Sequence, residues 1–302
     1  MTFQEMPVSA MPAAEVSIDR DLVRELILAQ ARQWAGKPLT YLATGWDNEV
    51  YRLGEDLLVR LPRRALAEKI GHKERQWLPR LSSDSGLDVG AAVFIGEPTA
   101  NYPFTFSICR YVPGISAATL GRTQRDAYAP AFIDYLLALH GPAPEDAPRS
   151  EFRGCELQAV DRRTREQISQ LPATYRRGAQ GIWEQSLEAE AYGGPPRWLH
   201  GDPHPHNTIV TTVAGRAELS ALVDFGDLCA GDPASDLGML WMHFTEEPRE
   251  QALQRYSVDR GMSMRLRARG WALRYAMLTA PLGAADPLGK IGRDTLKVLL
   301  KP

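Results

Sequence analysis

The chain has little cysteine, no long apolar run and no excess charge of either sign, and each absence excludes a class of protein. Its three cysteines, Cys109, Cys155 and Cys229, are odd in number and far apart, which excludes a disulfide framework and a cysteine-based zinc site. No apolar stretch approaches the roughly 20 residues that a membrane-spanning helix needs. The N-terminus lacks the basic start and apolar segment of a secretory signal. The cysteines are therefore expected to be reduced thiols of a cytoplasmic protein.

The charges of the chain nearly cancel. The formal net charge is −2, from 35 Lys and Arg against 37 Asp and Glu. The composition therefore implies no general attraction to nucleic acid or to a membrane surface. Hydrophobic content of 44% and charged content of 24% are typical of a globular protein. A chain of 302 residues is long enough for two domains or for two lobes of one domain.

The first third of the chain alternates apolar and polar residues over short runs, which predicts strands. Ser17 and Asp19 are candidate N-caps for a helix before the first strand. Residues 1–16, rich in Pro, Ala and Met, are expected to fray. The predicted elements are a helix over 20–34, a three-strand antiparallel meander over 39–43, 49–53 and 57–61, a helix over 65–81, and strands over 89–95 and 104–112.

The rest of the chain has mainly helical periodicity. Pro113-Gly114 ends the last of these strands sharply, and it is the best candidate for a boundary between two lobes. The predicted elements are helices over 125–140, 153–171 and 173–191, two short strands over 208–212 and 217–223, an apolar helix over 237–244, and further helices from residue 247 onward.

Acids and an amide are concentrated in two neighbouring stretches. Asp202 and Asn207 lie five residues apart, and Asp224 follows an apolar run a little further on. Phosphoryl transfer uses such a set, because one carboxylate orients the attacking hydroxyl while an amide oxygen and a second carboxylate hold Mg²⁺ on the phosphates. The pattern therefore predicts a phosphotransferase site.

The same stretch also permits a different interpretation, a zinc site. His200, His204 and His206 are close in sequence, and imidazole is a common zinc ligand. A zinc hydrolase needs further ligands, which Asp224 or Asp227 would have to supply. The phosphotransferase interpretation explains more residues with fewer assumptions. Asp227 is more simply explained as an exposed acid of a loop than as a metal ligand.

The first part of the chain contains candidates for nucleotide binding. Gly45, in the loop Thr44–Asn48, lets backbone N–H groups approach phosphates, although the loop taken alone is better explained as an ordinary hairpin turn. Arg60 ends an apolar strand, where it either reaches solvent at an edge or faces phosphates. Glu74, in the following helix, is a candidate partner for Arg60.

Taken together, these motifs resemble those of the aminoglycoside phosphotransferase family, within the protein-kinase-like superfamily. The matching residues are His200-Gly-Asp202 with Asn207, then Val223-Asp-Phe-Gly226, then Gly231-Asp-Pro-Ala-Ser-Asp-Leu237. The resemblance covers nearly the whole chain from about Leu39. It implies an α+β, bilobal, protein-kinase-like fold, with a small N-terminal antiparallel-sheet lobe over 1–112 for the nucleotide. A larger, mainly helical C-terminal lobe over 113–302 would hold the catalytic residues and the substrate.

The resemblance also implies a role for each matching position. Asp202 is the catalytic base or orienting acid, Asn207 and Asp224 ligate Mg²⁺, and Asp236 holds the catalytic loop through backbone N–H groups. The residues implied to bind the nucleotide are Thr44, Gly45 and Asn48 in the loop, Arg60, its partner Glu74, and Arg110, Tyr111 and Val112 beside adenine.

Two departures from the kinase pattern concern the phosphate donor. The loop has no complete G-x-G-x-x-G, and Arg60 stands where kinases have Lys. The donor is expected to be ATP. Because a guanidinium binds phosphate with a different geometry from an ammonium, GTP remains the alternative.

The acceptor is expected to be a hydroxylated small molecule. From Trp241 onward there are eleven Lys and Arg but only six Asp and Glu, which disfavours a polycationic aminoglycoside unless exposed helix faces hold the arginines. A macrolide or a hydroxylated metabolite is the alternative, so the motifs fit antibiotic resistance and metabolism equally. A nucleotide-binding protein without catalysis is the remaining hypothesis. The sequence indicates no oligomeric state.

Overall fold

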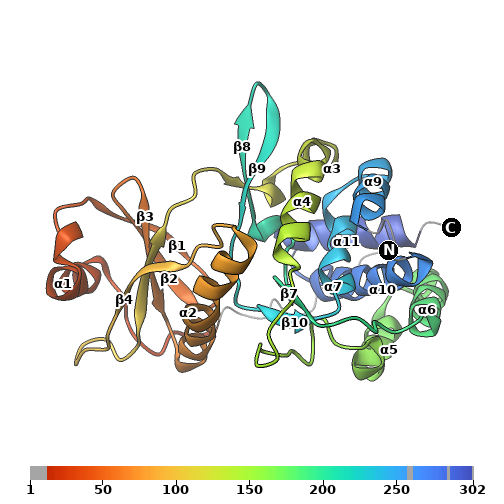
Figure 1. Ribbon diagram of the computed structural model, residues 1–302, viewed down its shortest axis with the longest axis horizontal. Coiled ribbons are helices and arrows are strands. Elements are labelled where there is room, and N and C mark those ends of the chain that lie inside the picture. The colour runs from red at the N-terminus through yellow and green to blue at the C-terminus, as the bar shows by residue number, and fades with distance from the viewer. Residues whose placement is uncertain (1–11, 257–260, 284–285, 301–302) are drawn as a thin grey trace. The chain divides into compact units, whose positions relative to one another are not determined.

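The computed structural model describes residues 12–256, 261–283 and 286–300. The chain divides into two compact units between Val112 and Pro113. Figure 1 shows a sheet with two flanking helices in the first unit and a mainly helical second unit. The predicted α+β class, a small antiparallel sheet followed by a larger helical part, is confirmed.

The sheet of the first unit is antiparallel throughout. In β3, Leu57, Val59 and Leu61 are buried in the apolar core, while Arg60 lies on the other face, as the two-residue period of a strand requires. The strand order is β1 (Leu39–Thr44), β2 (Asn48–Leu53), β3 (Leu57–Pro62), β5 (Phe106–Arg110) and β4 (Ala92–Gly96).

Helices α1 (Arg20–Gln30) and α2 (Ala65–Ser85) lie on opposite sides of this sheet (Figure 1). Asp19 caps α1 by accepting a hydrogen bond from the Leu22 N–H at 2.8 Å, as predicted. The apolar stripe of α1 packs into the core beneath the sheet. A short 3₁₀ helix, η1 (Arg32–Trp34), follows in place of the predicted last helical turn.

The expectation that residues 1–16 fray is wrong where the structure describes them, and residues 1–11 lie outside the described part. The Glu15 N–H donates to the Arg63 carbonyl at 2.8 Å, and the Glu15 carboxylate accepts from the Ala65 N–H at 2.9 Å. This carboxylate holds the first turn of α2, which lacks a side-chain N-cap of its own.

The second unit contains two small sheets. β6 (Ile115–Ser116), β8 (Thr208–Val213) and β9 (Arg216–Leu222) form one of them, in the order β6-β8-β9. β7 (Arg197–Leu199) and β10 (Cys229–Gly231) form the other, in which Leu199 pairs with Cys229.

Helix α10 (Gly261–Thr279) is the centre of the helical part. It is buried along most of its length, and it packs against other helices on several sides, so its sequence has no one-sided apolar stripe. The other helices are α3 (Arg122–Arg125), α4 (Ala129–Leu139), α5 (Asp161–Gln170), α6 (Ala173–Glu188), α7 (Ala234–Leu237), α8 (Leu240–His243), α9 (Glu246–Tyr256) and α11 (Pro287–Leu299), with 3₁₀ turns η2 (Ala117–Thr119), η3 (Asp126–Tyr128), η4 (Leu157–Val160) and η5 (Pro205–Asn207).

Two helix predictions in this unit are wrong in part. The predicted helix over 153–171 begins only at Asp161, after η4, because Gly154 has a φ of +61° that cannot continue a right-handed helix. The apolar stretch 237–244 is interrupted, since the Met242 N–H bonds to the Met239 carbonyl in a tighter, 3₁₀-type turn.

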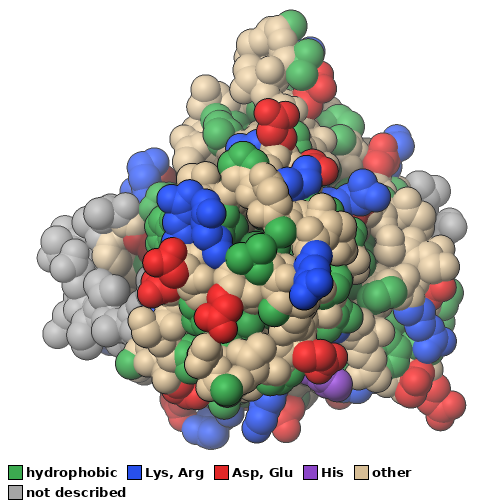
Figure 2. Space-filling view, turned by 90° about the vertical axis from the view of Figure 1, so that its left-hand side faces the viewer, with side chains coloured by type: hydrophobic (Ala, Val, Ile, Leu, Met, Phe, Trp, Pro, Cys, Tyr) green, Lys and Arg blue, Asp and Glu red, His purple; other side chains and the backbone are tan. Residues whose placement is uncertain are grey.

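The surface of the described residues is mixed in character. Figure 2 shows one face, on which Lys and Arg side chains lie among Asp, Glu and hydrophobic side chains. In the described ranges, no helix has the length and apolar character needed to cross a membrane.

Candidate active site

The strand β7 leads directly into the loop that contains Asp202. Gly201 in this loop has a φ of +88°, and a Cβ at this position would lie 2.3 Å from the Asp227 carbonyl oxygen. Only glycine fits such an approach. The Asp236 carboxylate, fully buried at the end of α7, accepts from the backbone N–H groups of His200 at 2.8 Å and Gly201 at 3.0 Å. The predicted role of Asp236 in holding this loop is confirmed.

The Asp202 side chain is 26% exposed, so its carboxylate remains accessible to a substrate. Its backbone carbonyl accepts from the His204 N–H at 2.8 Å and from the Asn207 Nδ2 at 3.1 Å. Two cationic or imidazole groups approach the carboxylate itself, the His204 Nε2 at 3.5 Å and the Arg153 Nη2 at 3.9 Å. The loop therefore fixes the backbone of Asp202 and presents its side chain.

The three histidines of the loop have separate roles. His200 is fully buried, and its Nε2 lies 3.1 Å from the Val223 carbonyl, so this nitrogen carries the proton. Burial lowers the pKa of His200 and keeps the ring neutral. The His204 Nδ1 accepts from the Asn207 N–H at 3.2 Å, whereas His206 is exposed. Among the described residues, no group of three His, Cys, Asp or Glu is arranged to hold a metal, so the structure adds no support to the zinc-hydrolase interpretation.

Asn207 and Asp224 present oxygen atoms. Because the Asn207 Nδ2 donates to the Asp202 carbonyl, the amide orientation that this bond selects leaves Oδ1 as a free acceptor. The Asn207 carbonyl accepts from the Val223 N–H at 2.9 Å, which ties the loop to the residue before Asp224. Asp224 is exposed, and within the described ranges its Oδ1 has one neighbouring donor, the Gly226 N–H at 3.4 Å. Amide and carboxylate oxygens are the ligands that Mg²⁺ prefers.

In the first unit, Arg60 and Glu74 form the predicted pair. The Arg60 Nη1 lies 3.0 Å from the Glu74 Oε2, and the Glu74 side chain is only 7% exposed. The pair lines a small cavity of this unit together with Asn48, the first residue of β2. The sequence therefore predicted this contact, although the two residues lie 14 positions apart.

The loop Thr44–Asn48 is a closed hairpin turn. The Gly45 N–H donates to the Asn48 carbonyl at 2.8 Å, and the Thr44 hydroxyl donates to the Glu49 carboxylate at 2.6 Å. Arg63 adds a bond from its guanidinium to the Gly45 carbonyl at 3.1 Å. The Gly45 N–H is thus engaged within the turn, so other groups of the loop would have to meet a phosphate.

The residues predicted to face adenine end the first unit. Arg110 is exposed at the end of β5, and the Tyr111 N–H donates to the Asp56 carbonyl at 2.8 Å. The Tyr111 ring lies 4.1 Å from the Arg52 guanidinium carbon. Within the described residues, Val112 makes no hydrogen bond through its backbone, and this leaves its N–H and C=O groups available.

Sequence reasoning missed Arg153. Its Nη2 lies 3.1 Å from Asp227, which is therefore ion-paired although its side chain is 48% exposed. Arg153 was expected inside a polar helix, where a solvated arginine carries no information. The only sequence signal was Gly154, which marks the loop that places Arg153 beside Asp202.

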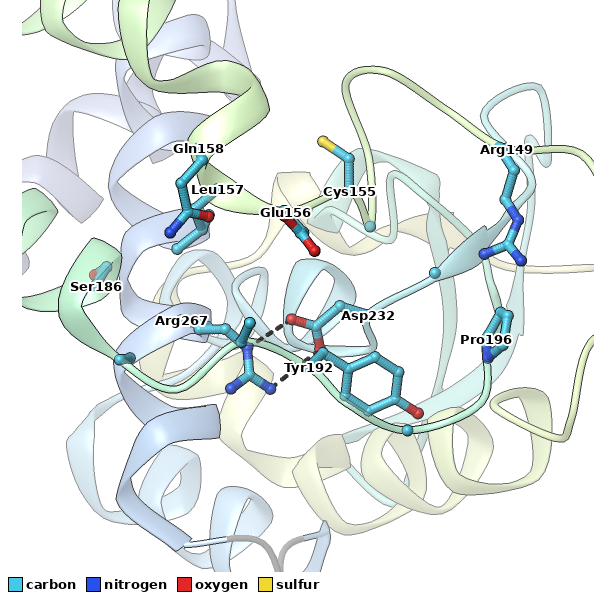
Figure 3. Close-up of a pocket in the computed structure, with 15 residues that line it drawn as sticks. Arg149, Cys155, Glu156, Leu157, Gln158, Ser186, Tyr192, Pro196, Asp232 and Arg267 are labelled. Carbon is cyan, nitrogen blue, oxygen red and sulfur yellow. Dashed lines mark hydrogen bonds and ion pairs between the residues drawn. The ribbon is translucent and has the colours of Figure 1, made fainter.

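A cavity of about 240 Å³ lies in the second unit, next to the loop that follows Arg153 (Figure 3). Cys155, Glu156 and Tyr192 line it, and the ion pair between Arg267 and Asp232, at 2.7 Å, forms part of its wall. Asp202, Asn207 and Asp224 do not line this cavity.

Comparison with known proteins gives one family match and a set of similar folds. The sequence model of the phosphotransferase enzyme family (APH) matches residues 38–271. The GDP complex of wild-type aminoglycoside 2'-phosphotransferase-IIIa is 18% identical, with a TM-score of 0.71 over 93% of this chain and 98% of that chain. No curated protein matches the chain.

Two further solved structures have the same fold. The macrolide 2'-phosphotransferase MphH from Brachybacterium faecium, as apoenzyme, is 19% identical, with a TM-score of 0.62 over 94% of this chain and 99% of that chain. The streptomycin-ATP-APH(2")-IIa ternary complex is 20% identical, with a TM-score of 0.57 over 93% and 96%. The fold expected from the motifs is confirmed.

Proposed function

Because this chain belongs to the phosphotransferase enzyme family, we propose that it transfers the γ-phosphoryl group of a nucleoside triphosphate to a hydroxyl group of a small molecule. The observation that carries this proposal is the geometry of the Asp202 loop. A partly exposed carboxylate stands on a backbone that Asp236 fixes, and two free oxygen ligands, from Asn207 and Asp224, belong to the same loop system.

The proposed reaction requires little covalent chemistry from these residues. Phosphoryl transfer passes through a loose transition state, so catalysis consists mainly of positioning and of neutralising charge. Asp202 accepts a hydrogen bond from the acceptor hydroxyl, orients its oxygen toward the phosphorus, and takes the proton as the new bond forms. Asp236 contributes by fixing the backbone from which Asp202 projects.

Asn207 and Asp224 fit Mg²⁺, and we propose that they hold it. Asn207 Oδ1 and the Asp224 carboxylate are hard oxygen donors with almost no competing hydrogen bonds. When bound, Mg²⁺ neutralises charge on the phosphate oxygens. The 3.1 Å bond from the Asn207 Nδ2 to the Asp202 carbonyl links the ligand to the catalytic acid, so that neither shifts alone.

The proposed nucleotide site belongs to the first unit. Arg60 would meet phosphate oxygens while Glu74 holds its guanidinium, and Thr44, Gly45 and Asn48 would supply the loop. Arg110, Tyr111 and Val112 would lie beside the base, with the free N–H and C=O of Val112 as hydrogen-bonding groups. ATP is the proposed donor and GTP the alternative, since similar structures hold either ATP or GDP.

A hydroxylated small molecule is the proposed acceptor, of the kind that the aminoglycoside and macrolide phosphotransferases take. The excess of Lys and Arg after Trp241 argues less strongly against a cationic acceptor once burial is considered. Arg249, Arg267 and Arg274 are buried, and Arg267 pairs with Asp232 at 2.7 Å. Cys109, Cys155 and Cys229 are not joined in disulfides, and we propose a cytoplasmic location on this basis.

The test is nucleotide turnover against a panel of aminoglycosides, macrolides and hydroxylated metabolites, measured by ADP or GDP release. We expect release that depends on one class of acceptor and on Mg²⁺. Asp202→Asn keeps the size of the side chain but removes its basicity, so we expect turnover to fall by at least about a hundredfold with nucleotide affinity retained.

The outcome separates catalysis from binding. Near-normal turnover in Asp202→Asn would contradict the assignment of Asp202. Stoichiometric binding of MgATP or MgGTP, without turnover on any acceptor or on water, would instead identify a nucleotide-binding protein that lacks catalysis.

A further inference from the structure

Arg153 is a cation that lies beside two acids of the candidate active site. Its Nη2 lies 3.1 Å from Asp227 Oδ2 and 3.9 Å from Asp202 Oδ1. Its side chain is only 15% exposed, which makes this pair stronger than one at the protein surface. One guanidinium thus lies between the catalytic carboxylate and a second acid.

The backbone around Arg153 is attached to the strands that lead to those acids. The Gly154 carbonyl accepts from the Asp232 N–H at 2.8 Å, just after β10. A Cβ on Gly154 would lie 2.3 Å from the Leu199 side chain in β7. Gly154 is therefore packed directly on the β7–β10 pair, and the guanidinium that precedes it is held at a fixed position relative to Asp202.

The guanidinium is also held from the side. Its central carbon lies 5.0 Å from the centre of the Tyr275 ring, a cation–π distance. The Tyr275 hydroxyl bonds to the Ser235 hydroxyl at 2.7 Å, next to Asp236. Ring and acids together therefore leave the Arg153 side chain little rotational freedom.

The donor groups of Arg153 are not all used. In the described part of the chain its Nε is buried and has no hydrogen-bond partner. A buried donor without a partner destabilises the folded state. Burial would lower the pKa of Arg153, but Tyr275, Asp202 and Asp227 raise it above its usual value, so the side chain stays charged. A side chain whose role was only to fill this space would not need to carry a charge.

We propose that Arg153 is a positioning residue for phosphoryl transfer, holding the Asp202 carboxylate in the orientation that receives the acceptor hydroxyl. The inference rests on the proposed function. Arg153 acts through Asp202 and is anchored by Asp227, while Cys155 and Glu156, two and three residues further on, line the cavity in Figure 3. The loop thus connects the wall of that cavity to the catalytic acid.

The experiment measures nucleotide turnover with water as the acceptor, together with the best compound of the panel, in four variants. Arg153→Gln removes the charge, Arg153→Lys keeps it, and Arg153→Ala leaves space for added guanidinium ion. Arg274→Gln is the matched control, since Arg274 is also a largely buried arginine of this unit but bonds to Thr164 instead of to Asp202 or Asp227.

We expect Arg153→Gln to lower kcat by about ten- to a hundredfold, with the Kd of MgATP unchanged within about twofold. Arg153→Lys should retain a larger share of kcat. Millimolar guanidinium should restore part of the activity of Arg153→Ala but none in Asp202→Asn. Arg274→Gln should lower the Tm while keeping kcat for the folded fraction.

Each result decides the proposal. Normal kcat in Arg153→Gln, while Asp202→Asn is inactive, overturns the role of Arg153 and leaves the phosphotransferase standing. A loss that follows the Tm, without recovery by lysine or guanidinium, shows that Arg153 only stabilises the fold. Absence of turnover in the wild-type protein, or normal turnover in Asp202→Asn, removes the proposed function and the role of Arg153 with it.

Discussion

At the scale of the residue, Asp224 combines an exposed carboxylate with a strained backbone. Its φ of +65° lies in the left-handed region, which costs a non-glycine side chain roughly 1 kcal/mol. Asp tolerates this conformation better than most residues, but no contact seen here requires Asp in particular. Backbone strain that persists in this way is typical of functional positions.

Replacing Asp224 with glycine should therefore separate stability from activity. We expect Asp224→Gly to leave the free energy of unfolding unchanged or raise it by up to about 1 kcal/mol, because glycine adopts this φ without strain. Turnover should fall sharply and lose its dependence on Mg²⁺ concentration. Urea unfolding and Mg²⁺ titrations of activity measure the two effects. Asp224→Asn, which keeps an oxygen and tolerates the same φ, is the control. A marked destabilisation, or an unchanged Mg²⁺ dependence, would argue against a ligand role.

For single residues, prediction from the sequence succeeded where the residues belong to one local motif, and it failed for a residue outside that motif. The motif around Asp202 and Asn207 is local, so its loop geometry follows from adjacent positions. Asp236 was also found, because a helix N-terminal acid after Gly231-Asp232-Pro233 is part of the same motif. Arg153 was not found, since its partners are distant in sequence and no periodicity marks a loop residue.

At the scale of the element, α7 supports the catalytic loop through one side chain. The Asp236 carboxylate accepts two backbone N–H groups of the loop, and His140 Nε2 lies 3.2 Å from its Oδ2. A fully buried carboxylate is tolerable only because these donors surround it. The short helix and the loop consequently form one hydrogen-bonded block.

We expect Asp236→Ala to cost about 3 kcal/mol of folding free energy, because it leaves two buried N–H groups without an acceptor. Turnover of the folded fraction should fall as well, since Asp202 loses its fixed backbone. Asp236→Asn keeps one acceptor oxygen and should show a smaller effect of the same kind. Chemical denaturation together with kinetics on refolded protein would test this. Equal stability of wild type and Asp236→Ala would refute the hydrogen-bonding role.

The elements themselves were predicted where their pattern is regular. The three-strand meander and α2 follow from clear alternation and from a long helical period. The helix expected from residue 153 failed, because polar loops and polar helices have similar compositions and only the φ of Gly154 distinguishes them. β7 and β10 are three residues each, too short for any periodic signal, and they are stabilised by pairing between distant segments.

At the scale of the whole molecule, buried histidines make folding sensitive to acid. His243 is fully buried, with its Nε2 2.9 Å from the Pro203 carbonyl and its Nδ1 2.8 Å from the Tyr128 hydroxyl. This pairing fits a neutral ring that donates through Nε2 and accepts through Nδ1. Burial, with Arg125 nearby, lowers the pKa of His243 well below its usual value.

Stability should therefore fall as the pH drops below the ordinary histidine pKa of about 6.5. Below that pH the unfolded chain binds a proton that the folded chain cannot, so each such histidine costs up to about 1.4 kcal/mol per pH unit. Urea unfolding between about pH 7 and pH 5 should show this slope, and His243→Gln should reduce it. His200, also buried with a lowered pKa, would account for a remainder. An identical slope in wild type and His243→Gln would contradict the assignment.

Counting charges along the sequence gave the wrong picture of the helical unit. The count treated the arginines after Trp241 as charges unfavourable to a cationic acceptor unless exposed helix faces hold them, but Arg267 pairs with Asp232 inside the protein, and Arg274 bonds to Thr164. Burial depends on tertiary partners, which a composition does not reveal. The fold class was accessible from sequence, whereas the electrostatic surroundings of the acceptor were not.

The pairing of Leu199 with Cys229 also has a mechanical consequence. At the end of the two-stranded sheet where these residues pair, β7 continues to Asp202 and β10 begins shortly after Asp227. Both acids are therefore attached to the same pair of hydrogen-bonded residues. Gly201 lies against the Asp227 carbonyl and closes the gap between the two segments. Any motion that displaces one segment must therefore carry the other with it, and the two acids keep their spacing while the loop moves.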